Sequence, residues 1–324
     1  MIFYIFLFLL SGLLLMVAGN WLVKALSRIA EFLGWKEFTV AFFLMSLATA
    51  APELLVGVSS ALKGIPELSL GNIIGQNIIH FAVAIPICVF FLGGFSVAAK
   101  TTRVTAYFSG LMALFPLVLI VDGTLGRLDG LALIATFLIY AFWLTGRRRR
   151  FSRRYDHPRE VIAGKPLGEK LKLFFQDFGL FGVGATILIL ASQGIVVSAM
   201  YFAESWHIPL IVIGTLIVGL GTAIPEIYFS ALAAKKGEGE LAAGNLLGST
   251  AVSTSLVLGL VALVSPIENI ALPAYVFSRL FLFLAVSLFI FFMSTGRKIT
   301  LKEGQWLFLV YIAFVITEIM IGLK

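Results

Sequence analysis

The sequence predicts an all-α integral membrane protein of about ten transmembrane helices, arranged as two inverted five-helix repeats. Three observations support this prediction. The 324-residue chain is 60% hydrophobic and only 13% charged, and its mean hydropathy of +1.03 is far above that of a water-soluble domain. Its apolar runs have the length that a helix needs to cross a bilayer. A motif of the first half returns in the second half at a constant offset.

The apolar runs give the order of the predicted helices. We expect them near residues 2–19, 36–62, 68–93, 104–121, 128–145, 179–202, 208–234, 240–264, 273–294 and 304–323. The segment between the two halves is basic and polar and contains Pro158 and Pro166, which is typical of a linker. The predicted organisation is therefore a first repeat at 1–145, a cytoplasmic linker at 146–177 and a second repeat at 178–324.

The basic residues predict the orientation in the membrane. Six arginines cluster in the linker, and most other basic loop residues fall on the same side when the spans are counted outward from it. Basic loops are retained in the cytoplasm, so both termini are expected outside. The net charge of +7 is explained by these loops, so no nucleic-acid partner is predicted. We expect a multi-pass protein of a prokaryotic inner (plasma) membrane, surrounded by lipid, and the sequence is compatible with a monomer.

The repeated motif has two parts. Residues 48–76 read ATAAPELLVGVSSALKGIPELSLGNIIGQ, and residues 221–249 read GTAIPEIYFSALAAKKGEGELAAGNLLGS. The offset between the two copies is constant, so Glu53 and Glu226 occupy equivalent positions. Each half holds an odd number of predicted spans, so the second copy is inverted relative to the first. Inverted repeats are typical of secondary transporters, whose ion sites lie where the repeats meet near the middle of the membrane.

The first part of the motif places a glutamate within an apolar segment. A carboxylate at the centre of a membrane helix costs ~2.5–3.5 kcal/mol or more, so Glu53 and Glu226 are candidate functional residues. The proline before each glutamate frees a backbone carbonyl one turn earlier. Thr49 and Thr222 add hydroxyl groups on the same turn. These hard oxygen ligands suit calcium, sodium or protons rather than copper or zinc. The sequence therefore predicts one cation site between the two glutamates.

The second part of the motif, Gly-Asn-x-x-Gly, opens another apolar segment in each half. Glycines four residues apart allow two helices to approach closely. Helical spacing places further polar residues on the same face as each asparagine, and these complete the candidate ligands: Asn72, Gln76 and His80 in the first copy, and Asn245, Ser249 and Ser253 in the second. Each stripe should face the other half. A single Asn, Ser or His in a membrane helix is more often a packing residue than a ligand, and this alternative stays open for them.

At these residues the chain resembles the two alpha repeats of the cation/calcium antiporter superfamily, most closely the sodium/calcium exchanger family. The family pattern is G-T-S-x-P-E followed by G-N-x-x-G-S-N, and both copies keep most of it. The similarity covers essentially the whole chain. The resemblance implies that Glu53 and Glu226 are central calcium ligands, assisted by Thr49, Thr222 and nearby carbonyls. It places Gln76 and Ser249 at the third-helix hydroxyl positions, and His80 and Ser253 at positions that hold Asn or Asp in the family.

Several residues depart from the family pattern. Ala50 and Ala223 stand where the family has serine, Gln76 replaces another serine, and His80 and Ser253 replace amide or acidic residues. The family builds its outer sodium sites at these positions. The resemblance therefore implies an intact central site but weak sodium coupling.

We expect a secondary active antiporter that exchanges Ca²⁺ for Na⁺ or H⁺ by alternating access. Two alternatives remain open: a proton- or monovalent-cation exchanger with little calcium transport, and a degenerate homologue that transports nothing. An enzyme is not expected, because the sequence has no metal-binding His pair, nucleophile elbow or phosphate-binding loop. Beyond the transported ions, no cofactor is predicted.

Overall fold

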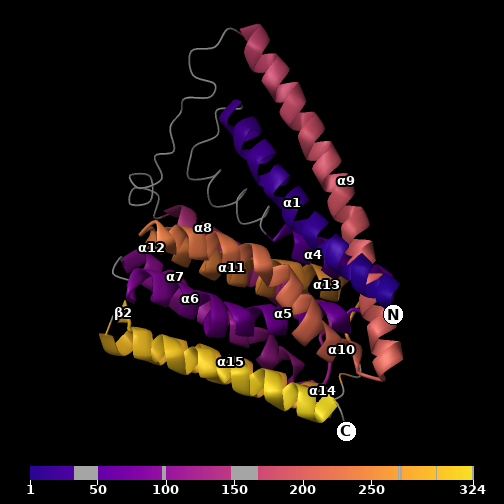
Figure 1. Cartoon of the computed structure of the whole chain (residues 1–324), viewed down its shortest axis with the longest axis vertical. Coiled ribbons are helices and arrows are strands. Elements are labelled where there is room, and N and C mark those ends of the chain that lie inside the picture. Colours follow the sequence, from indigo (N-terminus) through magenta and orange to yellow (C-terminus); the bar gives the residue numbers. More distant parts are fainter. Residues whose placement is uncertain are drawn as a thin grey trace.

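The computed structural model describes residues 1–32, 50–96, 100–146, 167–268, 270, 272–296 and 298–322. Helices dominate this part of the chain and confirm the predicted all-α membrane fold (Figure 1). Eight helices among the described residues are long and apolar enough to cross a bilayer. Together with the shorter apolar helix α4 (Ala51–Leu62) and with α8 (Arg127–Gly146), they are consistent with ten spans. The beginning of the span predicted at 36–62, up to residue 49, lies outside the described residues.

Over the described residues, the two halves have similar element orders. The first contains α1 (Ile2–Phe32), α4, α5 (Glu67–Ile79), a π-helical turn (His80–Ala84), α6 (Ile85–Leu92), α7 (Lys100–Leu119), a 3-10 turn (Ile120–Asp122) and α8. The second contains α9 (Leu167–Trp206), α10 (Leu210–Ile213), a π-helical turn (Gly214–Val218), α11 (Gly219–Lys235), α12 (Gly239–Ala251), a third π-helical turn (Val252–Val257), α13 (Leu258–Val264), α14 (Leu272–Gly296) and α15 (Leu301–Gly322).

Two helices are longer than predicted. The first runs to Phe32 instead of residue 19, and α9 begins at Leu167 instead of residue 179. Residues 167–177 of the predicted linker are therefore helical. Hydropathy detects only the part of a helix that lies in lipid, whereas the helix itself continues until a helix-breaking residue such as Gly or Pro. Residues 20–32 contain neither Gly nor Pro, and Pro166 is the last proline before α9.

The helices α1 and α9 lie side by side as a long tilted pair (Figure 1). At one end, the rings of Tyr4 and Tyr201 stack with their centroids 3.8 Å apart. Near the other end, Arg28 Nη2 and Asp177 Oδ1 form an ion pair at 2.6 Å. By the offset of the motif, Asp177 is the repeat equivalent of Tyr4, and Tyr201 is that of Arg28. The two contacts are thus repeat-related and hold the pair together near both ends.

Two short backbone pairings join the loops of one half to those of the other. β1 (Phe95–Ser96) pairs antiparallel with β2 (Lys298–Ile299), with Phe95 opposite Ile299. Leu125 pairs with Ile267 through two hydrogen bonds of 2.8 and 3.1 Å. Ile267 is the approximate repeat equivalent of Phe95, and Ile299 is that of Leu125. Because α7 separates β1 from Leu125, the two pairings lie at opposite ends of the bundle, as an inverted repeat requires.

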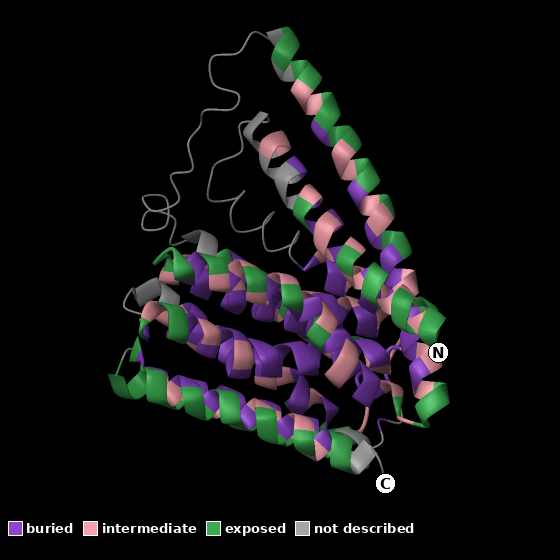
Figure 2. Ribbon diagram, in the orientation of Figure 1, coloured by how far each residue is buried: buried purple, intermediate pink, exposed green. Residues whose placement is uncertain are grey.

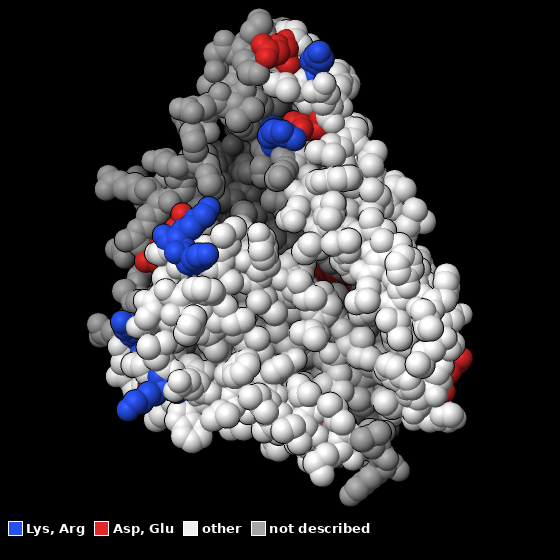
Figure 3. Space-filling view, viewed as in Figure 1, with Lys and Arg blue, Asp and Glu red and all other residues white. Residues whose placement is uncertain are grey.

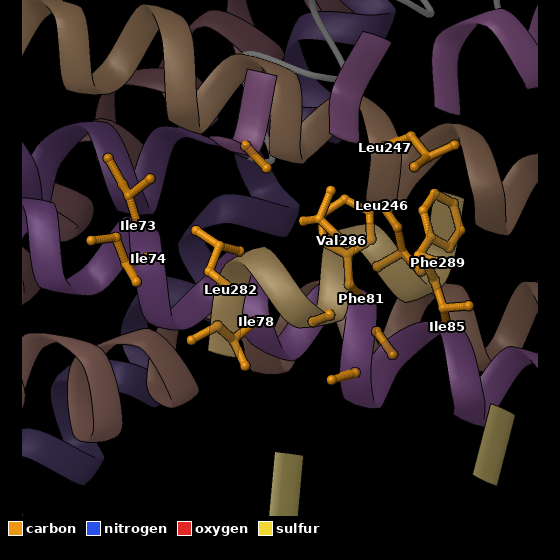
Figure 4. Close-up of a cluster of buried hydrophobic side chains, with 14 of the residues drawn as sticks. Ile73, Ile74, Ile78, Phe81, Ile85, Leu246, Leu247, Leu282, Val286 and Phe289 are labelled. Carbon is orange, nitrogen blue, oxygen red and sulfur yellow. The ribbon is translucent and has the colours of Figure 1, made fainter. Parts of the chain in front are cut away.

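The interior of the bundle is buried around α5, and the outer faces of α9 and α15 are exposed (Figure 2). Side chains of the α5–α6 span pack on α14, with the rings of Phe81 and Phe289 5.0 Å apart (Figure 4). Large apolar residues such as Trp306 and Phe142 are 63% and 83% exposed. An apolar exterior of this kind suits contact with lipid. The fold therefore buries most of the predicted site residues that the structure describes, including Glu53 and Glu226, in its interior.

Candidate ion-binding site

The candidate site forms where α5 of the first half crosses the α10–α11 span of the second half. A Cβ atom added at Gly71 would lie 2.1 Å from the carbonyl oxygen of Ile211, and one at Gly75 would lie 2.0 Å from that of Thr215. Only glycine fits at such distances. The prediction that these glycines allow close helix approach is confirmed, and the structure identifies the partner span. The contact brings the polar stripe of α5 directly against the second half.

The two glutamates lie in the same buried interior. Glu53 is in the first turn of α4, directly after Pro52, and is 0% exposed. Glu226 lies within α11, directly after Pro225, and is 2% exposed. Helix α5 links the two, because Gln76 of α5 bonds to Glu53 and Asn72 of α5 bonds to Thr222, one turn before Glu226 in α11. Two like charges so placed in a low-dielectric interior repel each other strongly unless a cation or protons neutralise them.

Several oxygen atoms around the glutamates have no hydrogen-bond partner among the described residues. They are Oε2 of Glu53, both carboxylate oxygens of Glu226, Oε1 of Gln76 and Oγ of Ser249. The Ser249 side chain lies beside Glu226, but its Oγ makes no hydrogen bond of good geometry. Buried polar atoms in native proteins are nearly always satisfied. A cluster of unsatisfied oxygens is therefore the pattern expected of a cation site.

Glu53 already has one partner. Gln76 Nε2 donates a hydrogen bond of 2.7 Å to Glu53 Oε1, and both side chains are fully buried. This hydrogen bond joins α4 to α5 within the first half.

The two motif asparagines occupy different environments. Asn72 is fully buried, and its Oδ1 accepts a hydrogen bond of 2.8 Å from Thr222 Oγ1 of the second half. Asn245 is half-buried, and its Nδ2 donates to Ser230 Oγ at 3.0 Å within its own half. Thr49, the repeat partner of Thr222, lies outside the described residues. Of these two asparagines, Asn72 bonds to the other repeat and Asn245 bonds within its own.

One turn further along, hydrogen bonds between the halves join the α5–α6 span to the α12–α13 span. His80 Nδ1 lies 2.9 Å from Thr250 Oγ1, and Asn77 Nδ2 donates to Thr254 Oγ1 at 2.9 Å. Ser253 instead bonds to the Thr250 carbonyl of its own helix at 3.4 Å. The first stripe therefore faces the other half as predicted, and His80 is held in place by packing and a hydrogen bond.

Both helices widen into π-helical turns here, at His80–Ala84 and Val252–Val257. π-helical turns often mark functional sites. Sequence reasoning missed these turns and the partners Thr250 and Thr254. Thr250 is the repeat equivalent of Asn77 and directly follows the second copy of the motif, so the sequence could have marked it as a candidate.

The molecular surface has a hollow. Figure 3 shows a hollow beside the α1–α9 pair, in an otherwise uncharged part of the surface, with acidic atoms at its floor. Among the described residues no group of three or more His, Cys, Asp or Glu could hold a metal ion. Two carboxylates, an amide oxygen and a hydroxyl are instead the ligands that hard cations such as calcium and sodium prefer.

Comparison with known proteins matches both halves to one family. The family model described as sodium/calcium exchanger protein matches residues 3–146 and 177–320. The chain is 26% identical to sodium/calcium exchanger MaX1 of Methanosarcina acetivorans, over 96% of this chain and 97% of the relative. It is 27% identical to inner membrane protein YrbG of Escherichia coli over 80% of each chain.

A solved structure shares the fold. The H⁺/Ca²⁺ exchanger CAX matches with a TM-score of 0.75 and 16% sequence identity, over 98% of this chain and 86% of that chain. The two segments that match the family model cover most of the chain, one in each half. The protein is a multi-pass membrane protein of the kind found in prokaryotic plasma membranes, and it belongs to the sodium/calcium exchanger protein family.

Proposed function

We propose that this antiporter binds Ca²⁺ between Glu53 and Glu226, near the middle of the membrane, and exchanges it for Na⁺ or H⁺. The observation that carries the proposal is the set of unsatisfied carboxylate oxygens, contributed by both repeats to one buried interior. Calcium takes six to eight oxygen ligands, including carboxylates and amide oxygens. The available oxygens match that preference.

The charges of the site explain how exchange arises. Two carboxylates balance one Ca²⁺, two Na⁺ or two protons. Because these species compete for the same oxygens, binding of one displaces the other, and a single site is enough for antiport. Burying two carboxylates without a cation or protons costs free energy. The protein with an empty site therefore has little tendency to switch between its outward-open and inward-open states.

The α1–α9 pair is suited to carry out that change of exposure. Among the described residues, its two helices pack mainly against each other, and the Tyr4–Tyr201 and Arg28–Asp177 contacts hold them together. Motion of one rigid pair across the core exposes a fixed central site to each side in turn, which is the usual form of alternating access in inverted-repeat transporters.

The proposal is tested with purified protein in liposomes. Radioactive calcium uptake is measured with a sodium gradient alone and with a proton gradient alone, for the native chain and for Glu53→Gln and Glu226→Gln. Glu318→Gln is the matched control, because Glu318 is also buried in a membrane helix but bonds to Ser278 outside the site. We expect uptake in the native chain and in Glu318→Gln, and near-complete loss in the two site variants.

Each other outcome has a clear meaning. Near-normal uptake in either site variant would refute the assignment of the site. Sodium–proton exchange without calcium uptake in the native chain would favour the monovalent-cation exchanger. Absence of all ion flux in a folded native chain would favour a non-transporting homologue.

A further inference from the structure

The two halves of the site differ at one pair of equivalent positions. Gln76 and Ser249 occupy the same place in their repeats, each as the last residue of its copy of the motif. Gln76 directs a hydrogen-bond donor at Glu53 Oε1, at 2.7 Å. Ser249 lies beside Glu226 with its oxygen unpartnered among the described residues. One glutamate is therefore engaged by an N–H donor, whereas neither oxygen of the other has a hydrogen-bond partner among the described residues.

This difference matters for cation binding. A cation and an amide N–H both seek the lone pairs of a carboxylate oxygen. The amide hydrogens carry partial positive charge, so a cation is repelled from the space that they occupy beside Glu53 Oε1. Glu53 offers its remaining oxygen, Oε2, and the Gln76 amide offers its own Oε1. Glu226 offers both of its oxygens.

The surrounding contacts hold Gln76 in this position. The preceding residue, Gly75, packs closely against the Thr215 carbonyl. The following residue, Asn77, is hydrogen-bonded to Thr254 of the other repeat. Gln76 itself is fully buried. Withdrawal of its amide would leave a buried donor without a partner, at a cost comparable to a lost hydrogen bond to a charged group.

We propose that Gln76 is a selectivity-determining residue that closes the cation position beside Glu53 Oε1, so that the transported ion lies off-centre, with Glu226 bidentate and Glu53 monodentate. This inference rests on the proposed calcium site. It means that the first half of the site has no room for a second, monovalent ion. A serine or threonine at position 76 has no N–H donor in its side chain. Glu53 Oε1 is then free, and the space beside it is open to Na⁺.

The test measures competition between sodium and calcium in the purified full-length chain. Equilibrium binding of radioactive calcium is titrated with Na⁺ at fixed pH for the native chain, Gln76→Ser and Gln76→Thr. A hydrogen bond to a charged group contributes about 1.5–3 kcal/mol, so its removal should lower the half-displacing Na⁺ concentration roughly tenfold or more. The converse variant, Ser249→Gln, directs a donor at Glu226 and should weaken calcium binding itself.

The outcomes separate this inference from the proposed function. Unchanged sodium competition in Gln76→Ser or Gln76→Thr, with calcium binding intact, would overturn the role of Gln76 and leave the calcium site standing. Native calcium affinity in Ser249→Gln would overturn the off-centre position. Absence of calcium binding in the folded native chain would instead refute the proposed function. The threonine variant fills more of the space left by Gln76, so the test still holds if the serine variant fails to fold.

Discussion

Replacing Gly75 by alanine should disrupt the helix crossing that assembles the site. An alanine Cβ would lie 2.0 Å from the Thr215 carbonyl oxygen, whereas ordinary contact begins at 3.4 Å, so the backbones must separate by about 1.4 Å at this point. Overpacking of this kind typically costs ~1–3 kcal/mol. The shift also moves the adjacent Gln76 and stretches its 2.7 Å hydrogen bond to Glu53. Both stability and calcium affinity should therefore fall.

The matched control for this variant is Gly182→Ala. Gly182 lies on the exposed face of α9, and an added Cβ there meets nothing within 4 Å. Alanine in an exposed helix is favoured over glycine, so this variant should unfold at the native temperature or slightly above it. Thermal unfolding in detergent and calcium binding are measured for both variants. If Gly75→Ala matched Gly182→Ala in both measurements, the close crossing of α5 with the α10–α11 span would not be essential to the site.

Three further predictions concern protons, sodium and the α1–α9 pair. Calcium affinity should fall as the pH is lowered from about 8 to 5.5, because protons bind the same carboxylate oxygens, and an affinity that is flat over this range would contradict a shared site. The combined variant Ala50→Ser, His80→Asn, Ala223→Ser and Ser253→Asp should show stronger sodium-driven calcium uptake than the native chain in the same liposomes. It adds oxygen ligands three residues before each glutamate and at the end of each polar stripe. Strong sodium-driven uptake in the native chain would refute the reasoning behind that variant. Arg28→Ala should lower the unfolding temperature more than Asp177→Ala. The first variant leaves the buried Asp177 carboxylate unpaired, whereas the second leaves a half-exposed guanidinium that can reach water. The reverse order would show that the ion pair does not hold α1 to α9.

The sequence predicted the spans and a close helix contact at Gly71 and Gly75, because both depend on local signals, but it did not identify the α10–α11 span as the partner. Hydropathy and the constant offset of the repeated motif were enough to define two inverted halves. The spacing of Gly71 and Gly75 was enough to predict a close helix contact, and the spacing of Asn72, Gln76 and His80 was enough to predict that one face of α5 turns toward the second half. The role of Glu53 and Glu226 as ion ligands stays a prediction, although the structure buries both in one interior.

The sequence could not predict how the side chains pair. Asn72 and Asn245 occupy equivalent places in the motif, yet one bonds to Thr222 across the repeats and the other to Ser230 within its own repeat. Partners of this kind depend on how close two helices lie, which sequence spacing does not state. For the same reason, the donation from Gln76 to Glu53 emerged only from the structure.

Direct localisation of the ion tests the central claim most sharply. A structure of the native protein determined with Ca²⁺, or with Sr²⁺ as a stronger scatterer, should show one ion between the repeats. The account predicts calcium at ~2.3–2.6 Å from both oxygens of Glu226 and from Oε2 of Glu53, with Gln76 still donating to Glu53 Oε1. An ion bound elsewhere, or one that contacts neither glutamate, would contradict the account.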